Sequence, residues 1–161
     1  MTDIAIRPAA AGDLDLIIGF IRALADYERL ADEVRLDRAV LGAHLFGLAP
    51  KAEVLIAESR GAAVGFALFF HSFSTFEGRP GIYLEDLFVA PEARGTGAGK
   101  ALLSALAALA LTRGCARLEW SVLNWNEPAI AFYRALGANS MEGWTVNRVE
   151  GAALGTLAGR S

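Results

Sequence analysis

This sequence is poor in the residues that build disulfides and metal sites. Its 161 residues include one cysteine, Cys115, and two histidines, His44 and His71. One cysteine excludes a disulfide within the chain and is compatible with a reducing cytoplasm. Because the two histidines lie far apart along the chain, we expect no metal site built from protein side chains.

Basic residues are also limited. Lysine occurs only at positions 51 and 100, and the formal net charge is −3. Binding to nucleic-acid phosphates requires a basic patch, which the sequence does not show, so we expect no nucleic-acid partner. A mildly acidic chain is compatible with a cationic substrate.

Long apolar runs are missing, although 54% of the residues are hydrophobic. Charges or glycines interrupt every apolar stretch before it reaches the roughly 18 residues that a membrane-spanning helix needs, so we expect no membrane partner. The first residues, MTDIAIRPAAAGD, lack the basic-then-apolar order of a secretion signal. These features indicate a cytoplasmic protein, and the length suits one domain over residues 1–161.

Apolar spacing predicts a mixed α/β domain in which strands and helices alternate. Asp13, Asp37 and Asn126 are expected to cap the helices that follow them. The predicted strands are 4–9, 52–59, 63–74, 81–90, 116–124 and 144–151, and the predicted helices are 13–29, 36–47, 97–113 and 127–136.

A strand–helix–strand–helix unit is expected from residue 81 to residue 136. The strands at 81–90 and 116–124 are then parallel neighbours, because a helix connects them. The glycines at 95, 97 and 99 fall in the turn after the first of these strands. Ligands of α/β proteins bind at such carboxyl ends of strands.

The glycine turn reads Arg94-Gly-Thr-Gly-Ala-Gly-Lys100 and does not match the nucleotide-binding loops. A P-loop would need glycine at position 94 and a hydroxyl at position 101, where the chain has Arg94 and Ala101. A dinucleotide fingerprint needs G-x-G-x-x-G, and the spacing here is G-x-G-x-G. A helix N-terminus with small residues still favours a phosphate group. A tight turn without a ligand is the alternative.

The pattern R-x-x-G-x-G resembles the loop that binds the pyrophosphate of acetyl-coenzyme A in the GNAT N-acetyltransferases. The resemblance implies a GNAT α/β (α+β) fold, with a mixed, mostly antiparallel twisted sheet, a parallel pair splayed at the coenzyme site, and flanking helices. It also implies that backbone groups at the end of the preceding strand contact the pantetheine arm. The coenzyme contacts implied in this region are Leu87, Phe88, Val89, Arg94, Gly95, Thr96, Gly97, Ala98, Gly99 and Lys100.

A second segment, WNEPAIAFYRALGA at 125–138, also resembles this family. The resemblance implies that Asn126, Pro128 and Ala129 contact the coenzyme and that Tyr133 lies near its sulfur. A phenol, whose pKa is about 10, can protonate a departing thiolate at neutral pH. The alternative is that Tyr133 is a packing residue like Phe132 beside it.

The segment YLEDLFV at 83–89 offers carboxylates for removing a proton from the amine. The resemblance implies that Glu85 acts as the base through a water molecule. Strand alternation places Glu85 on one face with Tyr83, and Asp86 on the other face with Leu84 and Phe88. One of the two carboxylates can instead be an ion-pair partner within the sheet.

Within the family, the order of IRPA, ADYE, STF-x-GRPGIYLED, the glycine loop, WNEPA and EGW resembles the spermidine/spermine (diamine) and thialysine acetyltransferases. The resemblance implies that Tyr27, Glu28, Glu85 and Glu142 line an amine pocket, and that the protein is a homodimer. Solvated surface positions are the alternative for Glu28 and Glu142. Ser74-Thr75-Phe76 is closer to the thialysine type, which favours a smaller amine than a long polyamine.

The sequence therefore predicts an acetyl-coenzyme A-dependent N-acetyltransferase. It acetylates a primary amine of a small diamine, polyamine or lysine-like substrate by direct attack, without a metal. The alternatives are an enzyme of this family that acts on a protein N-terminus or an antibiotic amine, and a non-catalytic acyl-coenzyme A sensor.

Overall fold

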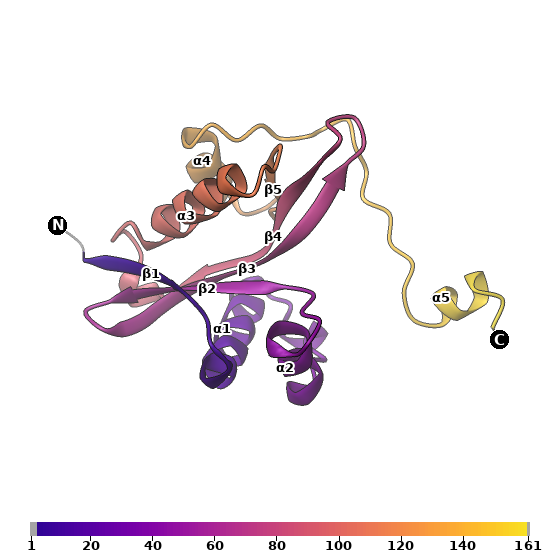
Figure 1. Cartoon of the computed structure of the whole chain (residues 1–161), viewed down its shortest axis with the longest axis horizontal. Helices are drawn as coiled ribbons and strands as arrows, with labels where there is room; N and C mark the ends of the chain where they lie inside the picture. Colours follow the sequence, from indigo (N-terminus) through magenta and orange to yellow (C-terminus); the bar gives the residue numbers. More distant parts are fainter. Residues whose placement is uncertain (1–2, 161) are drawn as a thin grey trace. The chain divides into compact units, whose positions relative to one another are not determined.

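The computed structural model describes residues 3–160 (Figure 1). Residues 1, 2 and 161, which the single-domain prediction includes, lie outside the described part. Contacts within the chain define two compact units, Met1–Leu123 and Asn124–Ser161, which are described separately. No helix among the described residues is long and apolar enough to cross a membrane.

The first unit is built on a five-stranded sheet in the order β1-β2-β3-β4-β5. The first four strands pair antiparallel, and β5 pairs parallel with β4. The mixed sheet and its parallel pair are as predicted. The strands are β1 (Ile4–Pro8), β2 (Glu53–Ser59), β3 (Ala62–Ser74), β4 (Arg79–Val89) and β5 (Leu118–Trp120).

Helices cover both faces of this sheet. Figure 1 shows α1 (Leu14–Tyr27) and α2 (Arg38–Phe46) on one face and α3 (Ala98–Thr112) on the other. On the α1 face, the rings of Phe20 and Phe66 stack with centroids 5.5 Å apart inside a buried apolar cluster. Short 3-10 turns lie at Ala11–Asp13, Ala31–Glu33 and Pro91–Ala93.

One of the two expected caps in this unit is confirmed and the other is wrong. The Asp37 carboxylate accepts a hydrogen bond from the Val40 N–H at 3.0 Å and caps α2. Asp13 makes no such bond to α1. Its carboxylate instead accepts from Arg7 and from the Ala10 N–H, both at 2.8 Å, which closes the 3-10 turn before the helix. The Arg7 guanidinium and this N–H lower the pKa of Asp13 to about 2.

A β-bulge interrupts β4 at Glu85. Leu68 of β3 pairs with Asp86, whereas the next residue, Phe69, pairs with Leu84, so Glu85 has no partner. Directly paired residues share a face of the sheet, and successive residues of β3 alternate between faces. Asp86 therefore lies on the α1 face with Leu68, opposite to Leu84. The prediction that Asp86 shares a face with Leu84 is wrong, because alternation does not continue through a bulge.

Two strand predictions also need correction. The strand expected at 116–124 forms regular pairing only at Leu118–Trp120, because its ladder with β4 ends there. The strand expected at 144–151 does not form among the described residues. A strand requires a ladder partner, and apolar spacing alone does not supply one. The second unit contains instead α4 (Glu127–Ala135) and α5 (Ala152–Leu157).

Candidate active site

The glycine loop joins β4 to α3 and exposes the N-terminus of that helix. Gly95 and Gly97 both have left-handed backbone conformations, with φ of +78° and +90°. Gly97 is the N-cap of α3, and no side chain caps the helix there. A Cβ built on Gly95 would meet no atom within 4 Å, so the backbone is open on that side. The unpaired N–H groups of a helix N-terminus bind anions, which makes this loop a candidate phosphate site.

Arg94 of this loop contacts two other predicted site residues. Its Nε donates a hydrogen bond to the Val89 carbonyl at 3.2 Å. Its guanidinium carbon lies 4.9 Å from the centre of the Tyr27 ring, a cation–π distance. The structure therefore brings the predicted phosphate loop, the end of β4 and the end of α1 together.

A group of carboxylates lies where α1 ends beside β4. Glu28 is the C-cap residue of α1, Asp86 lies on the sheet face that α1 covers, and Glu85 is exposed at the bulge. Burial, followed by the negative charges of Glu85 and Glu28, raises the pKa of Asp86 to about 6. Burial also raises the pKa of Glu28. A cationic substrate group would relieve the repulsion among these carboxylates.

Sequence reasoning gave Asp86 no role beyond that of an ion-pair partner. None of the ion pairs found between described residues includes Asp86. The available signal was two adjacent acids in an otherwise apolar strand, but the strand pattern could not show which one is buried.

The second unit carries the other predicted coenzyme residues on α4. The Asn126 side-chain oxygen accepts from the Ala129 N–H at 3.4 Å, so the predicted cap is confirmed. Pro128 and Ala129 lie in the first turn of α4, and the ring of Tyr133 lies 5.5 Å from that of Phe132. Asn126, Ala129 and Tyr133 are spaced along one side of the helix.

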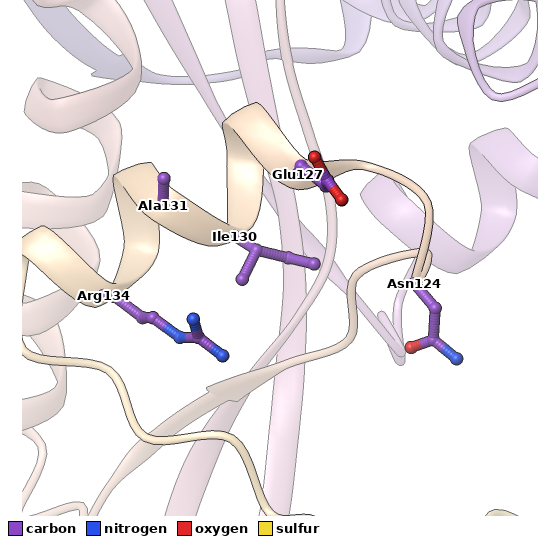
Figure 2. A pocket seen from close by; sticks show the side chains of 5 residues that line it. All are labelled: Asn124, Glu127, Ile130, Ala131 and Arg134. Atoms are coloured by element: carbon purple, nitrogen blue, oxygen red, sulfur yellow. The ribbon is translucent and has the colours of Figure 1, made fainter.

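A pocket in the same unit lies on an adjacent side of α4. Figure 2 shows Ile130 between Arg134 and the loop residue Asn124. No predicted site residue lines this pocket, whose lining is Asn124, Glu127, Ile130, Ala131 and Arg134. Glu142 lies outside helices and strands and is exposed.

Comparison with known proteins gives consistent matches. Residues 23–138 match the family model described as the acetyltransferase (GNAT) family. The chain is 42% identical over 171 aligned positions to a thialysine N-epsilon-acetyltransferase of Bos taurus, covering 99% of this chain and all of that protein. A human spermidine/spermine N(1)-acetyltransferase-like protein 1 is 35% identical over 153 positions, covering 89% of this chain and 22% of that protein.

A solved structure is similar over nearly the whole length. An integron cassette protein from the mobile metagenome of V. cholerae superposes with a TM-score of 0.79 at 30% identity, covering 98% of both chains.

Proposed function

The chain belongs to the GNAT acetyltransferase family, and from this premise we propose that it transfers an acetyl group from acetyl-coenzyme A to a primary amine of a small lysine-like, thialysine-type substrate. The observation that carries the proposal is the 42% identity, over nearly the whole chain, to an enzyme named for thialysine. The lower identity to the spermidine/spermine-like protein supports the smaller amine over a long polyamine.

The loop at the start of α3 fits the donor. The open backbone at Gly95 and the uncapped helix N-terminus suit a pyrophosphate, and Arg94 and Lys100 add positive charge. In this proposal, residues 94–100 hold the pyrophosphate and the backbone of Leu87, Phe88 and Val89 holds the pantetheine arm. Asn126, Pro128 and Ala129 contribute from α4. The bound coenzyme supplies the acetyl thioester.

Side chains of the protein then transfer two protons, one to the departing sulfur and one from the amine. Tyr133 donates a proton to the departing sulfur, which makes the thiol a better leaving group. The amine arrives as an ammonium ion and must lose a proton before it can attack directly. The resemblance favours Glu85 as the acceptor through water, and Asp86 is a second candidate. Tyr27, Glu28, Glu85 and Glu142 surround the substrate's positive charge in this proposal.

The remaining features rest on the composition of the sequence and, for the homodimer, on the resemblance. We treat residues 1–161 as one acetyltransferase domain that forms a homodimer in the cytoplasm. It requires no metal and acts on a small amine rather than on nucleic acid or a membrane.

Replacing Gly95 by Ala is expected to weaken acetyl-coenzyme A binding by about 10-fold or more. The turn holds residue 95 in a left-handed conformation, which costs an alanine about 1–2 kcal/mol. The new methyl group also enters the open side of the loop, where the proposed pyrophosphate binds. Isothermal titration calorimetry measures the Kd. Gly78→Ala is the matched control, because Gly78 has φ of +63° and equally open surroundings in the β3–β4 hairpin. Equal loss of affinity in both variants would contradict a donor site at this loop.

The acceptor is tested with a panel of amines. Purified protein is incubated with acetyl-coenzyme A and either thialysine, lysine, ornithine, short diamines, spermidine or spermine, and released thiol is measured. We expect kcat/KM to be highest for a lysine-like amino acid. Preference for spermine would contradict the small-amine assignment. Coenzyme binding without acetylation of any amine, including aminoglycosides and peptide N-termini, would favour a sensor.

A further inference from the structure

We propose that Asp86, rather than Glu85, accepts the proton from the substrate ammonium group. This inference rests on the proposed function and assigns one step of it. Three structural observations distinguish Asp86 from its neighbour, and each concerns residues of the first unit.

The first observation is the bulge in β4. Because Glu85 is the residue without a partner on β3, Asp86 returns to regular pairing with Leu68. That register places Asp86 on the α1 face, next along this face from Phe88 of the buried cluster. Glu85 is exposed, whereas Asp86 is partly buried. A carboxylate in partly apolar surroundings is a stronger proton acceptor than one in water.

The second observation is the absence of a neutralising partner. Among the described residues, no Arg, Lys or His forms an ion pair with Asp86. The charged groups that act on it are the carboxylates of Glu28, at the end of α1, and Glu85, beside it on β4. Partly buried carboxylates without a counter-ion are unfavourable for folding, so their presence indicates a ligand that supplies the positive charge.

The third observation connects this position to the donor loop. Tyr27, which precedes Glu28, lies under the Arg94 guanidinium, and Arg94 also bonds to Val89, three residues after Asp86. The end of α1 and the carboxyl end of β4 thus meet the loop proposed to hold the coenzyme. An amine placed at Asp86 is beside the strand end that is proposed to carry the pantetheine arm.

The proposed step moves two protons from the substrate nitrogen and one from Tyr133. The ammonium group gives one proton to the Asp86 carboxylate, and the freed nitrogen lone pair forms a C–N bond with the acetyl carbon. The C–S bond breaks, and sulfur leaves as a thiol with the proton of Tyr133. The nitrogen's second proton and the Asp86 proton pass to solvent, and Tyr133 regains one from solvent. One proton is released per turnover.

The pH dependence of kcat/KM tests the assignment. In the wild type, kcat/KM falls below an apparent pKa near 6, because the protonated Asp86 carboxyl cannot accept a proton. Asp86→Asn abolishes this acidic limb, which is the fall of kcat/KM at low pH, and lowers kcat about 100-fold. Glu85→Gln and Glu28→Gln each keep the limb but move it to lower pH, because each removes a negative charge that raises the Asp86 pKa. Asp32→Asn, an exposed acid in a 3-10 turn, leaves the profile unchanged.

A thermal melt provides a readout that needs no turnover. The Asp86 pKa is higher in the folded protein than in the unfolded chain, so the native state loses stability as pH rises from about 4 to about 6. Asp86→Asn removes this loss and raises Tm at pH 7.5 by about 3–6 °C. The difference largely disappears at pH 4, where most of the carboxyl is protonated in the native state. An unchanged Tm at pH 7.5 would contradict the burial on which the proposal depends.

Failure of the Asp86 assignment gives a different result from failure of the proposed acetyltransferase reaction. If the limb disappears in Glu85→Gln and only shifts in Asp86→Asn, the Asp86 assignment is overturned and the proposed acetyltransferase reaction stands. If the wild type acetylates no amine, the proposed reaction is overturned, and the catalytic role of Asp86 with it.

Discussion

Tyr133→Phe is expected to lower kcat by about 100- to 1,000-fold while acetyl-coenzyme A binds with nearly unchanged affinity. The substitution removes one hydroxyl and keeps the ring that packs beside Phe132. Without the phenol, sulfur must leave as an unprotonated thiolate, which raises the barrier of the acyl-transfer step. Steady-state thiol release gives kcat, and calorimetry with the coenzyme gives the Kd.

Tyr83→Phe is the matched control for this variant. The Tyr83 hydroxyl hydrogen-bonds to the Ser121 hydroxyl at 2.7 Å in the first unit and has no assigned part in the reaction. Its loss is expected to cost about 1 kcal/mol of stability and to change kcat less than threefold. Equal effects of the two variants, or full activity of Tyr133→Phe, would remove Tyr133 from its role as the proton donor.

Phe66→Ala is expected to lower the free energy of unfolding by about 3–5 kcal/mol. Phe66 is completely buried, and its ring stacks on Phe20 of α1 while its backbone pairs with Phe88 of β4. The truncation leaves a cavity between α1 and the sheet. Because α1 ends at the carboxylates around Asp86, the same cavity loosens the proposed amine site. Urea unfolding followed by circular dichroism measures the change.

Phe76→Ala is the matched control for Phe66→Ala, because it removes an aromatic ring that is not buried. Phe76 lies in the β3–β4 turn and is fully exposed, so its truncation is expected to change stability by less than about 0.5 kcal/mol. A loss below about 1 kcal/mol in Phe66→Ala would contradict the packing of α1 on the sheet.

Several features of the site followed from local spacing alone. The capping residues Asp37 and Asn126 were predictable, because a cap bonds to a backbone group three residues away. The turn from β4 into α3 was also predictable, since Gly95 and Gly97 occupy left-handed backbone positions and the helix that follows has its own apolar period. The parallel pairing of β4 with β5 followed from the connecting helix.

The errors have a common physical origin in partners that the apolar spacing does not reveal. The Asp13 carboxylate does not cap α1, because it bonds to the Ala10 N–H within a 3-10 turn and to Arg7 of β1. The strand expected at 144–151 had suitable residues but gained no ladder partner.

The sequence by itself determined the family, the glycine loop before α3 and the order of most elements, because these depend on residue identity at short, fixed spacings. Only the tertiary structure decided that Asp86 of the LED segment is partly buried while Glu85 is exposed. A bulge is defined by register against the neighbouring strand, and β3 lies more than ten residues away along the chain. The contact of Arg94 with Tyr27 likewise joins residues far apart in sequence. Folding brings Asp86 and the Arg94–Tyr27 contact to the place where α1 meets β4. The local sequence pattern does not show which residues meet there.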